Sequence, residues 1–451
     1  MFGHFTKVAP GICLVFATLA RAGDAGDCGV LPPPPWQMTQ LLPVVARCNR
    51  DVVAAQGMLM AADAEVRVSS QRPNPTLTLG VSNINPQAGI GPGNLFDKTV
   101  DTAVRLDQPI ERGGKAALRQ ATATASRQAS RSDLEMVVRQ QQAEFIKDWH
   151  TAVAAGERRD LLAEMLALSR QSEALASKRV QAGDLPANDL TRISLETLRA
   201  ETDLHQAEAE VRESGLAVLR LLGVNTASDS LTLSPAWPET VAPVTPTETV
   251  AIENRPDVAA LRARLESARS ARDLARALTR EDISVGLQVD HWPISAANQQ
   301  GTGNSLSLSV SLPLAIRHQH QGEIQRSEAD YRLAQDALDS ARQTALNDLA
   351  ARQAAVEAAR RRLDILQSRI IPASRQIADR AETAYAKGAG SVLDLLDSRR
   401  QLRQVSLEGV AARLDYARAL VDWRLAAGTT PDASEVPSSL PVPASVTESR
   451  Q

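Results

Sequence analysis

The two halves of this chain match each other at an offset of about 205 residues. The matched pairs are Gly183 with Gly388, Asp189 with Asp394, Leu190 with Leu395, and Gly223 with Gly428. Short solenoid motifs repeat every 20–50 residues or so, so this offset indicates one large structural unit present twice. Each copy combines strand-like segments with an unusually long helical segment. Few architectures accommodate both.

Each copy contains a long helical segment that ends in a turn. No proline lies between Pro109 and Pro186, and leucines and methionines in this interval show coiled-coil spacing. Roughly 70 residues of helix would form a rod on the order of 100 Å long. We predict turns at 183–188 and 388–393, each followed by a returning helix. In the second copy, Pro372 is expected to break or kink the long helix.

Four segments alternate apolar and polar residues, which is typical of half-exposed strands. They lie near 75–82, 100–110, 282–290 and 304–313. Strands of about 8–11 residues match the length needed to cross a bilayer at a tilt. Four strands cannot close a barrel, so a membrane barrel would require several copies; three copies would supply twelve strands. The alternative is a small soluble sheet that caps a helical stalk.

The remaining segments have simpler signatures. We predict an export signal at 1–22, because a short apolar core precedes a small-x-small cleavage site. The rest of the plan is a Pro-rich arm at 23–45, a first repeat at 46–223, a connector at 224–253, a second repeat at 254–428 and a disordered tail at 429–451. In an exported chain Cys28 and Cys48 could form a disulfide, although free thiols fit the sequence equally well.

Composition excludes several functions. The net charge is −3, from 50 basic and 53 acidic residues that are finely mixed, so nucleic acid is not an expected partner. Aromatic residues make up only 3%, which suits Ala/Leu-rich coiled coil better than a compact enzyme. No nucleophile elbow, phosphate loop or zinc-ligand cluster appears, so we predict no enzymatic activity and no cofactor. We interpret His291, His318 and His320 as solvated residues and predict no metal site.

Three motifs, in this order and spacing, resemble the outer-membrane efflux factor family, the TolC-like proteins. They are Leu106-Asp107-Gln108-Pro109-Ile110-Glu111-Arg112-Gly113-Gly114-Lys115, then Asn254-Arg255-Pro256-Asp257-Val258, then Tyr385-Ala386-Lys387-Gly388 followed by Asp394-Leu395-Leu396-Asp397. The resemblance covers about residues 46–428. The first motif is most like that of the CzcC-type branch, which is linked to heavy-metal efflux pumps.

The resemblance implies an internally duplicated α+β membrane protein. Three copies would form a twelve-stranded barrel in the outer membrane of a Gram-negative bacterium, with long periplasmic helices forming an α-barrel below it. The implied function is passive conduction of solutes, heavy-metal cations among them, from periplasm to exterior. The implied partners are outer-membrane lipid, a periplasmic adaptor (membrane fusion) protein and an RND-type inner-membrane pump. The alternative is an exported coiled-coil or adhesin-like scaffold without a channel.

The resemblance also assigns a periplasmic gate to Asp189, Asp394, Asp397 and Tyr385. Three-fold copies of a carboxylate around a narrow axis attract cations and repel one another. Some family members carry an arginine where this chain has Gly390, which is a departure from the pattern. For Asp189 and Asp394 the alternative role is helix N-capping, which needs only a side-chain oxygen.

Two further groups of residues have implied positions. The helix-turn tips, where the adaptor is expected to bind, contain Gly183, Leu185, Gly388 and Val392. The joints at which strand gives way to helix contain Pro109, Gly113, Gly114 and Pro313.

Overall fold

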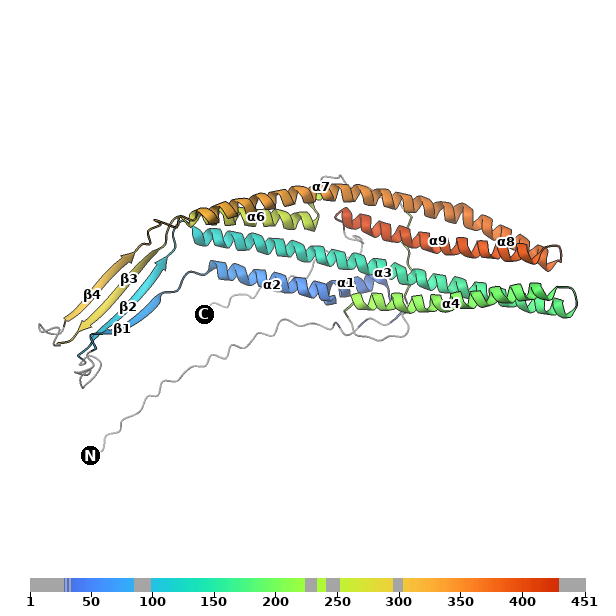
Figure 1. Cartoon of the computed structure of the whole chain (residues 1–451), viewed down its shortest axis with the longest axis horizontal. Coiled ribbons are helices and arrows are strands. Elements are labelled where there is room, and N and C mark those ends of the chain that lie inside the picture. The colour runs from blue at the N-terminus through green and yellow to red at the C-terminus, as the bar shows by residue number, and fades with distance from the viewer. Residues whose placement is uncertain are drawn as a thin grey trace, which may run out of the picture.

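The computed structural model describes residues 28, 31, 34–84, 99–223, 233–240, 252–294 and 303–429. The molecule is a long rod, with a sheet at one end and two helical turns at the other (Figure 1). The helices are α1 (Met38–Cys48), α2 (Arg50–Ser70), α3 (Lys115–Gln181), α4 (Ala187–Leu221), α6 (Pro256–Ala277), α7 (Gln321–Ile365), α8 (Ile371–Ala386) and α9 (Val392–Ala426). The strands are β1 (Thr76–Ser82), β2 (Asp101–Ile110), β3 (Ile283–Trp292) and β4 (Gly303–Ser311). The predicted signal peptide, and the predicted tail beyond Thr429, lie outside the described residues.

The duplication is visible in the order of elements. The first repeat runs α2, β1, β2, α3, α4, and the second runs α6, β3, β4, α7, α8, α9. The four strands form one antiparallel sheet in chain order, so the β2–β3 pairing joins the two repeats. None of the described helices is both long and apolar enough to cross a membrane.

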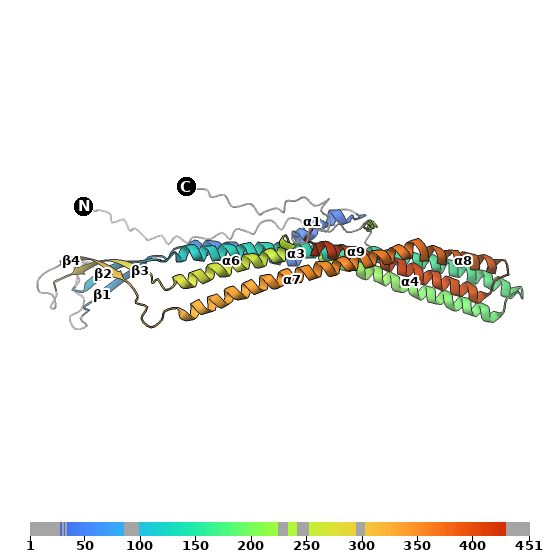
Figure 2. The ribbon, with the colours of Figure 1, turned by 90° about the horizontal axis from the view of Figure 1, so that it is seen from above.

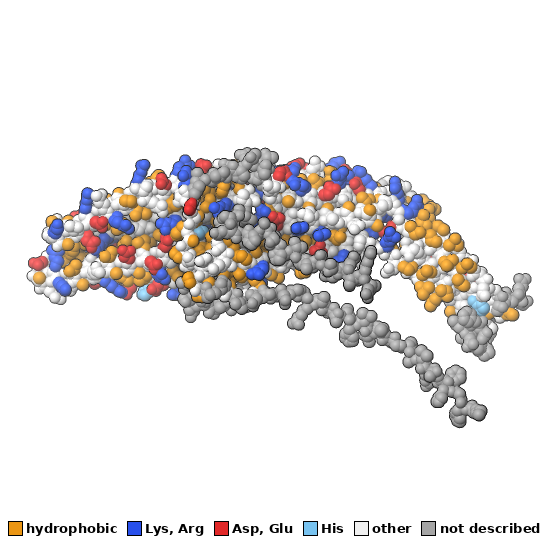
Figure 3. Space-filling model, turned by 180° about the vertical axis from the view of Figure 1, so that it is seen from behind, with side chains coloured by type: hydrophobic (Ala, Val, Ile, Leu, Met, Phe, Trp, Pro, Cys, Tyr) orange, Lys and Arg blue, Asp and Glu red, His pale blue; other side chains and the backbone are white. Residues whose placement is uncertain are grey.

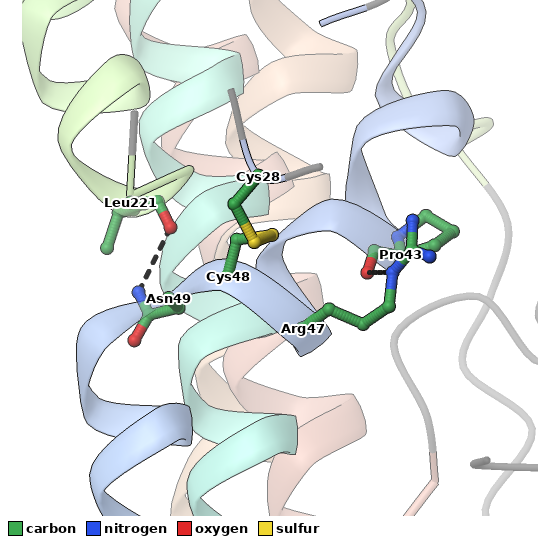
Figure 4. Close-up of a disulfide and its surroundings, with 6 residues drawn as sticks. All are labelled: Cys28, Pro43, Arg47, Cys48, Asn49 and Leu221. Atoms are coloured by element: carbon green, nitrogen blue, oxygen red, sulfur yellow. Dashed lines mark hydrogen bonds between the residues drawn. A yellow bond between two sulfur atoms is a disulfide. The ribbon is translucent and has the colours of Figure 1, made fainter. Parts of the chain in front are cut away.

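Two shorter helices, α2 and α4, follow one another along the rod beside the longer α3 (Figures 1 and 2). The side chain of Asn49 accepts hydrogen bonds from the amides of Asp51 and Val52 and so caps α2. Its Nδ2 donates to the carbonyl oxygen of Leu221, near the end of α4, at 3.0 Å (Figure 4). In the second repeat, Arg255 donates to the carbonyl of Ala426 at 3.2 Å and links α6 to α9 in the same way.

The segment predicted as a Pro-rich arm contains a helix, so the predicted boundary at 45/46 is wrong: it falls inside α1. Pro43 lies within this helix and costs it about 3 kcal/mol. Leu41, Leu42 and Val45 are buried, and each contributes about 1.5–3 kcal/mol, which outweighs that cost. These side chains belong to a core that includes Trp149 of α3.

The same region settles the state of two cysteines. Cys28 and Cys48 form a disulfide, which ties the chain before α1 to the end of that helix (Figure 4). Cys48 immediately precedes the Asn49 cap, so the disulfide lies next to the residue that links α2 to α4.

Glycines end the long helices by one repeated mechanism. At the end of α3, Gly183 donates to Val180 at 3.0 Å and Asp184 donates to Arg179 at 2.8 Å. Gly388 and the residue after it repeat this pair of bonds at the end of α8. This is the Schellman motif, which requires a left-handed residue, and both glycines have positive φ. The duplicated glycine pattern in the sequence therefore reflects duplicated helix ends.

At the α1–α4 junction, Gly223 has both a positive φ and a crowded Cβ position. An added Cβ would collide with the carbonyl oxygen of Cys48. We expect Gly223→Ala to lower the melting temperature by several degrees more than Gly183→Ala. Gly183→Ala is the matched variant. It carries the same left-handed strain, about 1–2 kcal/mol, but no described atom lies within 4 Å of its Cβ position. Thermal unfolding followed by circular dichroism tests this, and equal shifts would contradict it.

Pro372 sits just after a π-helical turn formed by Leu366–Ile370. Proline lacks an amide hydrogen, and a π-turn is one way a helix accommodates the lost bond. The first repeat has α3 as one continuous helix at the corresponding place, so the two halves differ here.

Candidate functional site

One face of the sheet is apolar and exposed. Residues opposite one another in the strand register share a face, and two cross-strand rows consist only of leucine and valine. The rows are Leu77, Leu106, Leu287, Leu308 and Leu79, Val104, Val289, Leu306. All eight side chains are exposed, with Leu308 at 74%. The apolar surface at the sheet end contrasts with the charged surface of the helical rod (Figure 3).

The opposite face of the sheet is polar. Arg105 forms an ion pair with Asp107 at 2.7 Å, and its Nη2 donates to Ser309 Oγ at 3.3 Å. Gly286 lies beneath this group, and a Cβ there would collide with the Asp107 carboxylate. The sheet therefore has one apolar face and one charged, hydrogen-bonded face. This distribution is expected when lipid covers one side and water the other.

The sheet also has two open edges. Among the described strands, β1 pairs only with β2 and β4 pairs only with β3. Exposed edges that carry large apolar residues favour pairing with another chain. The sheet is thus incomplete both at its edges and on its apolar face.

The joint between β2 and α3 is compact. Gly113 and Gly114 both have positive φ, and they make the bend between Ile110 and Lys115. Asp282, just before β3, accepts from the Arg112 amide at 3.0 Å and from Lys115 Nζ at 2.9 Å. Burial alone would raise the pKa of Asp282, but these two donors outweigh it and lower that pKa.

The second joint, between β4 and α7, is longer. Pro313 follows the end of β4 by two residues, and α7 begins only at Gln321. His320 occupies the N-cap position of α7 with a φ of 55°. Leu314 and Ile316 in this connection are exposed. The two repeats therefore leave the sheet by different routes.

At the other end of the rod, α3 and α4 form one helical hairpin, and α8 and α9 form a second. The two hairpins meet in a small apolar cluster. Its buried members are Ala176, Ile193, Tyr385, Val392, Leu395 and Leu396, with Leu185 and Leu190 packed against them. Val392 is 6% exposed and packs inside this cluster, and its adaptor contact stays a prediction. Leu185 is half-buried, whereas Gly183 and Gly388 lie at the exposed turns.

The predicted gate aspartates are accessible at this tip. Asp394 and Asp397 are exposed near the start of α9, and Asp189 is half-buried near the start of α4. The capping alternative is wrong for Asp189 and Asp394, because the N-cap residues are Pro186 and Ser391. The carboxylates instead lie in the first turns, where the helix dipole favours negative charge.

Tyr385 is buried within the tip. Its ring lies 5.2 Å from the guanidinium carbon of Arg179, and that guanidinium also donates to the Tyr385 carbonyl at 3.5 Å. The Tyr385 hydroxyl has no hydrogen-bond partner among the described residues. The residue thus connects α8 to α3 through its ring and backbone.

Ion pairs between the two hairpins were not predicted from the sequence. Glu196 of α4, with a side chain only 11% exposed, lies 2.8 Å from Arg400 and 3.5 Å from Arg403, both of α9. Arg399 donates to Ser172 of α3 at 2.7 Å. The sequence carried one signal: Glu196 and Arg400 lie 204 residues apart, close to the repeat offset, so near-equivalent positions carry opposite charges.

A cleft of about 330 Å³ lies between the hairpins beside these pairs, lined by Glu196, Arg399 and Arg403 among others. Without the Glu196 charge, Arg400 would keep only Asp397 at 3.7 Å, and Arg403 would keep Asp203 at 3.2 Å. The tip is therefore an assembly of two hairpins held by one apolar cluster and a set of charge-assisted hydrogen bonds.

The chain thus combines an amphipathic sheet, open at both edges, with a duplicated coiled-coil rod. The chain belongs to the outer membrane efflux protein family, whose model matches residues 42–224 and 249–429. It is 24% identical over 398 residues to the cobalt-zinc-cadmium resistance protein CzcC of Cupriavidus metallidurans, covering 86% of this chain and 89% of that protein.

Solved structures show the same fold. A membrane protein from Pseudomonas aeruginosa superposes with a TM-score of 0.73 at 20% identity, covering 86% of this chain and 92% of that one. The open state of the MtrE outer membrane channel of Neisseria gonorrhoeae gives a TM-score of 0.71 at 18% identity, covering 87% and 89%.

Proposed function

We propose that this protein is the outer-membrane channel of a tripartite efflux pump and conducts solutes passively from the periplasm to the exterior. The observation that carries the proposal is the sheet, whose exposed face is apolar and whose other face holds a charged network. Exposure of the apolar face to water would be unfavourable, and so would exposure of the charged face to lipid. A membrane barrel with a wet lumen satisfies both.

Three copies are the proposed assembly. Each copy supplies four strands with two free edges, and pairing β4 of one copy with β1 of the next would leave no edge. Twelve strands would then surround a lumen lined by the polar face. The long helices of three copies would continue the tube into the periplasm.

The two helical turns are the proposed periplasmic end. There the exposed turns at Gly183 and Gly388 would meet a periplasmic adaptor, which links the channel to an inner-membrane pump of the RND type. The family relationship and the distance of the turns from the sheet support this placement (Figure 1). Heavy-metal cations are the proposed cargo, supported by similarity to the cobalt-zinc-cadmium resistance protein.

The proposed gate consists of Asp189, Asp394, Asp397 and Tyr385. Replacing Asp394 and Asp397 by alanine should raise single-channel conductance and weaken block by multivalent cations, because a ring of three carboxylates attracts such ions. The matched control is Asp364→Ala, an exposed aspartate on α7 between the tip and the sheet. Planar-bilayer recordings measure both quantities, and an unchanged block would contradict the gate assignment.

The test of the channel itself is planar-bilayer conductance of the purified mature protein in detergent, with its mass measured in the same preparation. We expect small cation-selective steps from a species of three chains. If the protein never inserts into the bilayer, the channel proposal is wrong. The second candidate, an exported coiled-coil scaffold, would then become the better explanation of the rod.

A further inference from the structure

Two histidines and a glutamate come together where β4 gives way to α7. His318 Nε2 lies 3.1 Å from Glu323 Oε1, and His320 Nδ1 lies 3.8 Å from the same oxygen. The three ligand atoms all lie within 4.8 Å of one another. The two imidazole rings are 4.5 Å apart and packed edge to face.

His320 is held in an unusual position. Its φ of 55° is rare for a residue with a side chain, and its side chain is only 18% exposed. Its Nδ1 is buried without a hydrogen-bond partner among the described residues, although the Glu323 carboxylate faces it. A buried ring nitrogen that lacks a hydrogen bond carries a desolvation cost, so an additional partner at this point would relieve it.

The other nitrogen of His320 faces a second carboxylate. Glu281, in the connection between α6 and β3, lies 3.8 Å from His320 Nε2. Histidines that bind metals commonly present their second nitrogen to a carboxylate, which orients the ring and makes it a stronger ligand. Here Glu281 faces one ring nitrogen of His320, while the other ring nitrogen faces Glu323, which His318 also approaches.

We propose that His318, His320 and Glu323 bind one divalent transition-metal ion of the zinc type, with Glu281 as the positioning carboxylate. Two imidazoles and one carboxylate suit borderline metals such as Zn²⁺ and Co²⁺. Metal–ligand distances of about 2.0–2.2 Å require the three donors to close in slightly from their present separations. His318 is largely exposed and can supply that movement.

The site would have two properties. Three protein ligands leave an open coordination position, which a water molecule would occupy. The ion would also link the α6–β3 connection, through Glu281, to the β4–α7 connection. Those two segments join the sheet to the helices of the second repeat, where no glycine pair makes the compact bend found at Gly113 and Gly114.

The sequence prediction of solvated histidines does not hold for His320. The spacing His-x-His is common in exposed loops, and nothing in it reveals that the chain turns left-handed at the second histidine. That turn brings the ring of His320 back toward Glu323, in the first turn of α7. The site is independent of the channel function, because it is defined by local geometry in one chain.

The test is direct titration of the purified mature protein, without a polyhistidine tag, with Zn²⁺ by isothermal titration calorimetry at neutral pH. We expect one ion per chain. His318→Ala and His320→Ala should each remove that binding, and Glu281→Gln should weaken it by about 10–100-fold. His205→Ala is the matched control, because His205 lies 3.3 Å from Glu208 on α4 but forms no three-residue cluster of possible metal ligands among the described residues.

The outcomes separate a metal site from an ordinary ion pair. The proposal is supported if His318→Ala and His320→Ala lose zinc binding while His205→Ala keeps it. No binding in the unmodified protein, or binding that His318→Ala leaves unchanged, overturns it. His318 is exposed, so its variant tests the site even where His320→Ala fails to fold. Mg²⁺ serves as a second control and should bind far more weakly, because it prefers oxygen ligands.

Discussion

Replacing Leu308 with arginine is expected to abolish insertion of the protein into lipid. Leu308 is 74% exposed, lies near the middle of β4 and ends a cross-strand row on the apolar face of the sheet. An arginine at the middle of a lipid-facing strand costs about 2–4 kcal/mol. Three copies in one barrel would raise that cost to roughly 6–12 kcal/mol. This is comparable to the entire stability of many folded proteins.

The matched variant is Ser307→Arg, one residue earlier in β4. Successive strand residues point to opposite faces, so this arginine would enter the polar side with Arg105 and Asp107. We expect this variant to insert and to conduct, with altered ion selectivity. Flotation with liposomes and heat-modified gel mobility measure insertion. Equal insertion of the Leu308 and Ser307 variants would contradict the assignment of lipid to the apolar face.

The strands and helix ends follow from local sequence. Alternation of period two depends on residues adjacent in the chain, and the structure places strands at all four alternating segments. The glycines at 183 and 388 end helices because no other residue adopts the left-handed C′ position as readily. Features that depend on a residue's own backbone preferences could therefore be read before any tertiary contact was known.

The helix α1 was missed because two local signals pointed the wrong way. A run of four prolines lies just before it, and Pro43 lies inside it. What stabilises α1 is burial of Leu41, Leu42 and Val45 against α3, about 100 residues further along the chain. No local pattern reports a surface supplied from so far away.

The contacts between the hairpins were missed for a related reason. Each charged residue at the tip resembles an ordinary solvated residue on a coiled coil. Only the duplication, which brings near-equivalent positions of the two copies face to face, identifies Glu196 and Arg400 as partners. Comparing charges at positions within one residue of the repeat offset would have found them.

Reversing the charge of Glu196 is the second change for which we expect a large effect. In Glu196→Arg, the new guanidinium would face Arg400 and Arg403 across a partly buried interface, where like charges are poorly screened. The α3–α4 and α8–α9 hairpins should separate at the tip. We therefore expect a several-fold rise in single-channel conductance and easier proteolysis at the turns.

Two further variants decide whether that rise reports the interface or only a change of charge. Glu201→Arg makes the same change on α4, but Glu201 pairs with Arg170 of the same hairpin, 2.9 Å away, so conductance should stay near that of the unmodified protein. The exchange Glu196→Arg with Arg400→Glu restores one attractive pair, and a double-mutant cycle should show coupling of about 0.5–3 kcal/mol. Asp397, 3.7 Å from Arg400, would repel the exchanged glutamate and keep the recovery incomplete. If the exchange leaves conductance as high as in the single variant, the salt bridges do not hold the tip closed, and closure must rest on the apolar cluster around Tyr385 and Leu395.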